Sequence, residues 1–121
     1  MINLTPGEIE VMKVLWERGG EMSPPEIEEK FPRPIKNAAL RFQLKILLEK
    51  GHVTRRRVGK AYFYKAVTPR QRTFKSMARR MAEIFFAGST AGLIAELIKT
   101  ENLSDKEIQE LEQLAKGKKS H

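Results

Sequence analysis

The segment from Val53 to Ala66, VTRRRVGKAYFYKA, combines cationic side chains with two runs of residues that favour β-strands. A Val-Gly-Lys sequence separates the two runs and is typical of a hairpin turn. Guanidinium and ammonium groups held this closely together bind phosphate oxygens well. The segment is therefore predicted to be a β-hairpin that contacts the backbone of a polyanion. Its cations are Arg55, Arg56, Arg57 and Lys60.

The basic residues are concentrated in the middle of the chain. The 121 residues carry a net charge of +8, but residues 33–80 hold 15 lysines and arginines against one glutamate. The segments on either side have an excess of acidic residues. Such a block predicts a polyanionic partner, and nucleic acid is favoured over an anionic membrane because phosphate contacts release counterions. A charged face that serves solubility alone is the alternative.

The sequence offers no arrangement for catalysis. It has no cysteine, its only histidines are His52 and His121, and Asp105 is its only aspartate. These residues do not fall at the spacing of metal ligands, and no glycine-rich phosphate loop precedes a helix. No serine has a recognisable base and orienting acid. The protein is therefore predicted not to be an enzyme and to need no metal or other cofactor.

Three helices are predicted before the hairpin. The first two each begin with a capping box, in which a serine or threonine is followed three residues later by a glutamate. The boxes are Thr5 with Glu8 and Ser23 with Glu26. The third helix is predicted from about residue 36 to 50, ending at Gly51. Three helices followed by a basic hairpin predict a winged helix-turn-helix domain over residues 1–69, in a mainly α fold with a small β-hairpin wing.

The third helix is the predicted recognition helix. A helical projection gives it two apolar sectors, one with Leu40, Leu44 and Leu47 and one with Ala39, Phe42 and Ile46, so burial on two sides is expected. The remaining strip is small, basic or amide-bearing, which suits the major groove of double-stranded DNA. The predicted base-contacting residues are Lys36, Asn37, Ala38, Arg41 and Lys45, with Asn37 and Arg41 as the main base readers.

Residues 70–116 are predicted to form three short amphipathic helices, with Ser104 and Glu107 starting the last one. So few residues cannot close a stable core alone, so a helical dimerisation domain is predicted, with packing back onto the first domain as the alternative. Residues 117–121 are predicted to be a disordered tail. The predicted dimerisation residues are Phe74, Met77, Met81, Ile84, Phe85, Leu93, Leu97, Ile108 and Leu111.

Two other functions are compatible with this composition. The winged helix could serve as a protein-interaction module, which predicts a buried or acidic strip on the third helix. A small molecule could also bind between the C-terminal helices, in a pocket lined by Phe74, Met77, Met81, Phe85 and Phe86. No apolar run is long enough to span a bilayer and the N-terminus does not resemble a secretory signal, so a cytoplasmic protein without membrane insertion is predicted.

Three segments of the sequence resemble the penicillinase repressor family of winged-helix transcriptional repressors. They are LTPGEIEVMKVLW, LKILLEKGHVTRRRVGKAYFYKAVTP and LSDKEIQELEQL, and the resemblance extends from Leu4 to Leu114. It implies a homodimeric repressor with an N-terminal winged helix, a C-terminal dimerisation domain and a palindromic operator in double-stranded DNA.

The sequence departs from the family pattern at three places. In antibiotic-responsive members, a membrane-bound zinc peptidase sensor triggers cleavage of an Asn-Phe bond, and the matching positions here are Glu96 and Leu97. The copper-responsive members use C-terminal cysteines, which this chain does not have. The recognition helix lacks the threonine-rich start of the family and has Ile46 in place of an arginine. These departures predict a different operator and leave a sensor or protease partner without its cleavage sequence.

Overall fold

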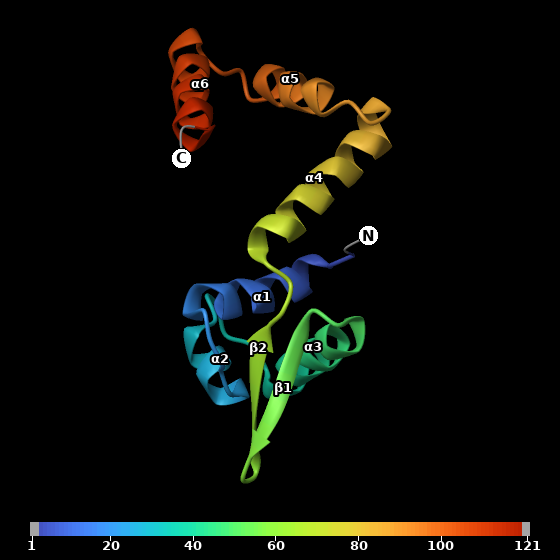
Figure 1. Cartoon of the computed structure of the whole chain (residues 1–121), viewed down its shortest axis with the longest axis vertical. Helices are drawn as coiled ribbons and strands as arrows, with labels where there is room; N and C mark the ends of the chain where they lie inside the picture. The colour runs from blue at the N-terminus through green and yellow to red at the C-terminus, as the bar shows by residue number, and fades with distance from the viewer. Residues whose placement is uncertain (1–2, 120–121) are drawn as a thin grey trace. The chain divides into compact units, whose positions relative to one another are not determined.

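The computed structural model describes residues 3–119, which form six α-helices and one two-stranded sheet (Figure 1). The chain divides into two compact units, one up to Met77 and one from Ala78. The elements are α1 (Pro6–Arg18), α2 (Pro24–Lys30), α3 (Asn37–Lys50), β1 (Val53–Val58), β2 (Ala61–Ala66), α4 (Arg70–Phe86), α5 (Thr90–Thr100) and α6 (Asp105–Lys119). The unit boundary lies inside α4, and residue 69, where the sequence places the domain boundary, directly precedes that helix.

The predicted capping signals are confirmed at the helix ends. In α1 the Glu8 backbone N–H donates to Thr5 Oγ1 at 3.2 Å, and the Thr5 N–H donates back to the Glu8 carboxylate. In α2 the Ser23 N–H and hydroxyl both donate to Glu26 Oε1 at 3.0 Å. Gly19 and Gly51 end α1 and α3 with positive φ angles of 71° and 80°, a conformation that glycine adopts without strain.

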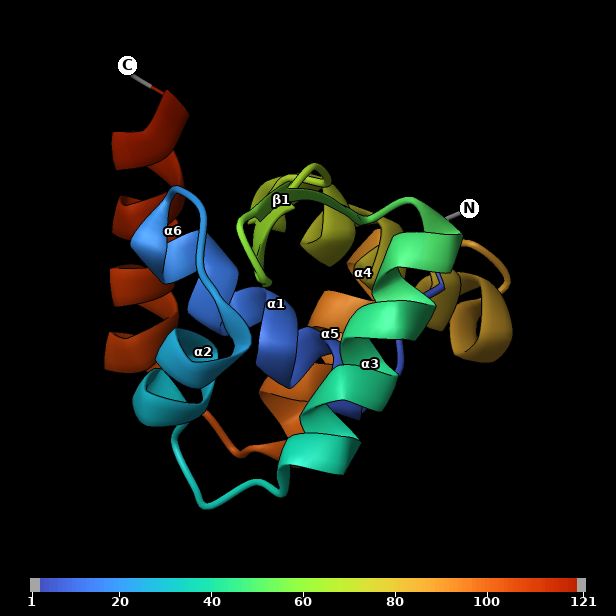
Figure 2. The same ribbon diagram turned by 90° about the horizontal axis from the view of Figure 1, so that it is seen from below.

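The core of the N-terminal unit is formed by α1, α2, α3 and the hairpin, and Figure 2 shows the three helices grouped around one another. The backbone groups of Met22 and Tyr64 exchange two hydrogen bonds of 2.8 and 2.9 Å, which attach the segment before α2 to strand β2. Burial of these apolar side chains is the main source of the stability of the unit. The fully buried side chains are Val11, Met12, Leu15, Met22, Ile27, Leu40, Leu44, Leu47 and Val53.

Burial of α3 on two sides was predicted and is wrong. Leu40, Leu44 and Leu47 are completely buried, but Phe42 on the other apolar sector is 60% exposed. Ala39 is also exposed, and Ile46 is half-buried. The helix packs against the core through one face only, so its opposite face is available to a partner.

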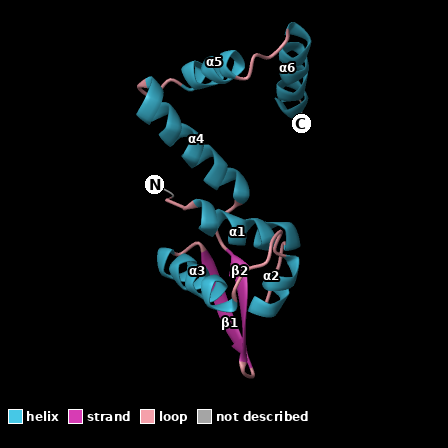
Figure 3. Cartoon of the chain, turned by 180° about the vertical axis from the view of Figure 1, so that it is seen from behind, coloured by secondary structure: helices cyan, strands magenta, loops and turns pink. Residues whose placement is uncertain are grey.

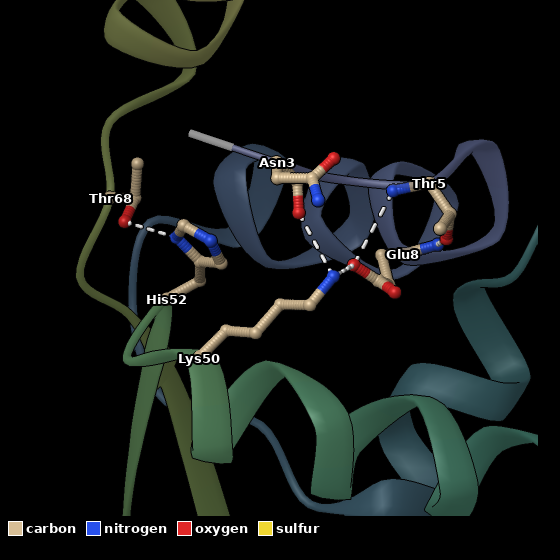
Figure 4. A network of polar contacts seen from close by, with 6 residues as sticks. All are labelled: Asn3, Thr5, Glu8, Lys50, His52 and Thr68. Atoms are coloured by element: carbon tan, nitrogen blue, oxygen red, sulfur yellow. Dashed lines mark hydrogen bonds and ion pairs between the residues drawn. The ribbon is translucent and has the colours of Figure 1, made fainter. Parts of the chain in front are cut away.

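A polar network joins the start of α1 to the end of α3 (Figure 4). Lys50 Nζ donates to the Glu8 carboxylate at 2.7 Å and to the carbonyl oxygen of Asn3 at 2.9 Å. The Glu8 side chain is only 3% exposed. Burial alone would raise the pKa of Glu8, but the hydrogen bonds from Lys50 and Thr5 outweigh that effect and hold the pKa below its ordinary value. The charged Glu8 carboxylate therefore stabilises the packing of α1 against α3.

His52 lies near this network and contacts the segment before α4 (Figure 4). Its imidazole Nδ1 is 2.8 Å from the hydroxyl oxygen of Thr68, and both residues are buried. Burial and the neighbouring Lys50 charge lower the pKa of His52, which favours the neutral imidazole. His52 is the residue that enters β1, as the sequence predicts, and its contacts are structural.

Replacement of Glu8 by Gln should remove a pH-dependent part of the stability. A carboxylate whose pKa is lowered on folding stabilises the protein above its ordinary pKa, and this contribution is lost as the pH falls through the lowered value. We expect the wild type to be more stable than Glu8→Gln by about 1–2 kcal/mol near neutral pH. Urea unfolding followed from pH 7 to pH 3 should show the difference shrinking towards zero.

Glu29→Gln, which changes an exposed carboxylate on α2, is the matched control for this measurement. The difference in the free energy of unfolding between Glu29→Gln and the wild type should not shrink in this way as the pH falls. A constant difference between the wild type and Glu8→Gln across the pH range would contradict the stabilising role of the charged carboxylate.

The C-terminal unit consists of the rest of α4 together with α5 and α6. Ser104 and Glu107 form the predicted cap of α6, since the Ser104 N–H and hydroxyl donate to Glu107 Oε1 at 3.1 Å. The helix α5 begins at Thr90, where the Gly92 N–H donates to Ser89 Oγ at 2.9 Å and so caps its first turn. The helix α6 runs to Lys119, past the predicted start of the tail at residue 117, and residues 120–121 lie outside the described residues.

Among the described residues, no helix by itself is long and apolar enough to cross a membrane. Taken together, α4 and α5 have the length and apolar composition of a membrane-spanning segment, but the two helices meet at a bend of 82°.

Candidate nucleic-acid interface

The exposed face of α3 carries every residue that the sequence predicts to contact bases. Lys36 is the N-cap of the helix, and the others lie on its first three turns. None of them is covered by another part of the N-terminal unit, because the buried leucines hold the opposite side of the helix against the core. The residues that are exposed on this face are Lys36, Asn37, Ala38, Arg41 and Lys45.

The N-terminus of α3 differs from those of α1, α2 and α6. In each of those three helices, a glutamate in the first turn accepts a hydrogen bond from the backbone N–H of the N-cap residue. The N-cap of α3, Lys36, makes no side-chain capping hydrogen bond, and the first turn has no acidic residue. The partial positive charge of the α3 N-terminus is therefore not neutralised from within the helix and is compatible with an anionic partner.

Arg41 is oriented by a contact within α3. Its Nε atom donates to Asn37 Oδ1 at 2.9 Å, one turn earlier on the helix. Because this bond uses only Nε, the two terminal nitrogens of the guanidinium remain as a parallel pair of donors. That pair matches the two acceptors on the major-groove edge of guanine. The same bond occupies one of the two lone pairs of the Asn37 oxygen, so Asn37 can position Arg41 and still contact a base.

The strands β1 and β2 form the hairpin that the sequence predicts (Figure 3). They pair antiparallel, with Arg55 opposite Tyr64 and Arg57 opposite Tyr62. Gly59 has a φ of 63° at the first of the two loop positions, which is the pattern of a type II′ turn. The tip of the hairpin extends beyond α1, α2 and α3 in Figure 3.

The register places the three wing arginines on two faces of the hairpin. Arg55 and Arg57 share a face with both tyrosines, and the Arg55 guanidinium lies 4.1 Å from the centre of the Tyr62 ring. The Arg57 guanidinium lies 5.8 Å from the same ring. Arg55 also donates to the Tyr64 hydroxyl at 3.3 Å, and Arg57 donates through Nε to the carbonyl oxygen of Gly59 at 2.9 Å. Stacking on Tyr62 limits the rotamers of both side chains and presents their charges from a fixed position.

Arg56 lies on the opposite face and forms an ion pair. Its Nε atom donates to Glu21 Oε2 at 2.6 Å, and this bond lowers the pKa of Glu21. Both side chains are accessible to solvent, with Arg56 65% exposed. An exposed pair of this kind contributes little to stability. If a phosphate approached Arg56, Glu21 would compete with it for the guanidinium group.

Replacement of Glu21 by Gln should strengthen DNA binding without changing its sequence preference. The substitution releases Arg56 and removes a negative charge beside the wing, so we expect roughly two- to five-fold tighter binding to every duplex. The measurement is fluorescence anisotropy, both with a random duplex and with a duplex that the protein selects from a random pool. Glu17→Gln, which removes an exposed charge from α1 away from the wing, is the control. Equal gains from the two substitutions would mean that only net charge matters.

Phe42 lies on the exposed face of α3, although the helical projection of the sequence assigns it to a buried sector. The buried side of α3 is centred on Leu40, Leu44 and Leu47, and Phe42 projects almost directly away from them. Reading that single leucine cluster as the only buried side would have placed Phe42 at the centre of the exposed face.

The predicted dimerisation residues are mostly accessible in the single chain. The five that lie on α4 fall within about 100° of one another around the helix axis. No residue of α5 is buried, and Phe85 is 71% exposed. Leu93 and Ile108 are half-buried. The exposed members of the predicted set are Phe74, Met77, Met81, Ile84, Phe85, Leu97 and Leu111.

The residues at the cleavage position of the family, Glu96 and Leu97, are exposed and lie in the middle of α5. A backbone inside a helix does not fit an extended protease subsite without local unfolding. Nothing in this segment supplies the Asn-Phe pair of the antibiotic-responsive members.

The model of one protein family, described as penicillinase repressor, matches residues 4–117. The chain belongs to the penicillinase repressor family. This family member is a winged-helix, DNA-binding transcriptional regulator of the repressor type, and members of such families are typically not enzymes. The exposed basic face of α3 and the basic hairpin are therefore the candidate recognition helix and the candidate wing of this repressor.

One solved structure shows a similar fold at low sequence identity. The hsRosR-S4 chain, solved as a complex, has a TM-score of 0.51 and 19% identity, and the match covers 83% of this repressor and 90% of that chain. NolR from Sinorhizobium fredii has a TM-score of 0.48 and 20% identity, with coverage of 67% and 74%. No curated protein matches the sequence.

Proposed function

We propose that this penicillinase repressor family member acts as a homodimer on a palindromic operator. The observation that carries the proposal is the exposed face of α3, which combines basic and amide side chains with an N-terminus that no acidic residue caps. A strip of this chemistry fits the major groove, where base edges lie between phosphates. The alternative use as a protein-interaction module predicts a buried or acidic strip, and the exposed basic strip argues against it.

In the proposed complex, α3 reads base edges and the wing contacts phosphates. Arg41 donates to guanine through its terminal nitrogens, and Asn37 holds Arg41 in place. Lys36 and Lys45 lie at the two ends of the exposed face and contact bases or phosphates. The wing supplies Arg55, Arg57 and Lys60 to the backbone, and Arg56 joins them when it leaves Glu21.

The apolar surfaces of α4, α5 and α6 support the proposed homodimer. The side chains are exposed over three helices, and exposed apolar patches of this extent favour association. A second copy supplies the same surface, and two-fold symmetry is the commonest way to cover it. A two-fold dimer presents two α3 helices to two inverted half-sites, which is why the operator is expected to be a palindrome.

The experiment that tests this proposal is selection of bound sequences from a random duplex pool at near-physiological salt. Recovery of a motif with two inverted half-sites would support a dimeric, sequence-specific repressor. Recovery of an unrepeated half-site would retain base reading and contradict the palindrome. Binding that weakens with salt but enriches no motif would mean that the basic residues contact only the backbone, and the proposal would be abandoned.

A further inference from the structure

We propose that Phe42 reads the methyl group of a thymine in the major groove, an inference that rests on the proposed function. Phe42 is 60% exposed at the centre of the face of α3 that points away from the core. A single exposed phenylalanine on an ordinary surface needs no explanation. Phe42 does need an explanation, because the face of α3 that surrounds it enters the major groove in the proposed complex.

The neighbours of Phe42 on α3 leave its ring free and close to the DNA. Ala38 and Ala39 lie one turn before it, so no bulky side chain stands between the ring and the N-terminal end of the helix. Side chains on a helix lean towards its N-terminus, which places the ring over these alanines. The small residues permit close approach of α3 to the floor of the groove.

The charges around Phe42 favour DNA over a protein partner as the surface that covers it. Arg41 precedes Phe42 in the sequence and Lys45 follows it by one turn, and both are exposed. Glu49, near the far end of the helix, is the only acidic residue on α3. An apolar ring with cations beside it is complementary to an apolar group with phosphates on either side. In unmodified DNA, the thymine 5-methyl is the only methyl group on the major-groove edge.

The contact predicts discrimination against bases that lack the methyl group. Burial of one methyl or methylene unit is worth about 0.8 kcal/mol, which corresponds to about four-fold in affinity for each half-site. The aromatic ring carries no hydrogen-bonding group, so it does not distinguish bases by their donors and acceptors. Phe42 therefore adds selectivity for thymine beside the position that Arg41 reads.

The test uses the operator recovered in the selection experiment. Each thymine is replaced in turn by deoxyuridine, which removes only the methyl group, and the affinities of the full-length wild type and Phe42→Ala are compared. We expect one position in each half-site at which uracil weakens wild-type binding about four-fold and leaves Phe42→Ala unaffected. At that position, 5-methylcytosine should bind the wild type more tightly than cytosine does.

The control is Val67→Ala, which shortens another exposed apolar side chain outside α3 and the hairpin. It should retain the wild-type response to uracil, and Phe42→Ala should retain the wild-type melting temperature because its side chain lies outside the core. Equal uracil responses in the wild type and Phe42→Ala, or no response at any thymine, would overturn the role of Phe42 and leave the repressor function intact. Failure of the selection to yield any motif would overturn both.

Discussion

Leu97→Glu is expected to abolish the proposed homodimer and to weaken binding to the proposed operator roughly a hundred-fold or more. Leu97 is 51% exposed on α5, a helix with no buried residue in the single chain. In a two-fold interface the substitution would introduce a carboxylate from each copy, and burial of an unpaired charge is strongly unfavourable. Loss of the proposed dimer would separate its two α3 helices, so each half-site would have to bind its own monomer independently.

Analytical ultracentrifugation measures the first effect and operator titration measures the second. The control is Ala95→Glu, which adds the same charge about 160° around the α5 axis from Leu97. It should remain dimeric and bind the operator with nearly wild-type affinity. The loss in Leu97→Glu should not extend to a duplex with only one half-site. A dimeric Leu97→Glu protein, or a wild type that is monomeric at micromolar concentration, would contradict an interface through α5.

The fold of the N-terminal unit was predictable because its signals are local. A capping box and a terminal glycine specify a helix within a few residues, as Thr5, Glu8 and Gly19 do for α1. The hairpin was likewise predictable, because a Gly at its turn and alternating side chains fix the register within fourteen residues. These features can be predicted without knowing which residues pack against them across the core.

The details that the sequence did not predict depend on partners distant in the chain. Glu21 and Arg56 are 35 residues apart, and Glu8 and Lys50 are 42 residues apart. No periodicity relates the members of either pair. Packing of α1 against α3 brings Glu8 to Lys50, and the pairing of the segment before α2 with the hairpin brings Glu21 to Arg56. The exposure of Phe42 has the same cause, since an apolar sector on a helix does not reveal whether the fold supplies an element to cover it.

Arg41→Ala is expected to have the second large effect, a selective loss of affinity for the operator. A bidentate contact from arginine to guanine contributes about 1–3 kcal/mol of discrimination, so the loss should be roughly 5- to 150-fold for each half-site. Binding to random DNA should fall much less, because it depends on phosphate contacts. Arg41→Lys should not restore the operator affinity, since an ammonium group cannot donate in a parallel pair. Equal losses on the operator and on random DNA would contradict base reading.

The hydrogen bond between Asn37 and Arg41 extends this prediction to a double-mutant cycle. If Asn37 acts by holding the Arg41 guanidinium, Asn37→Ala should weaken operator binding in the wild type but have little effect in an Arg41→Ala background. If Asn37 instead reads adenine on its own, the two losses should add. Affinities measured on the selected operator, and on the same duplex with the guanine replaced, separate the two cases. Non-additive losses confined to the guanine-containing operator would assign the base contact to Arg41 and its orientation to Asn37.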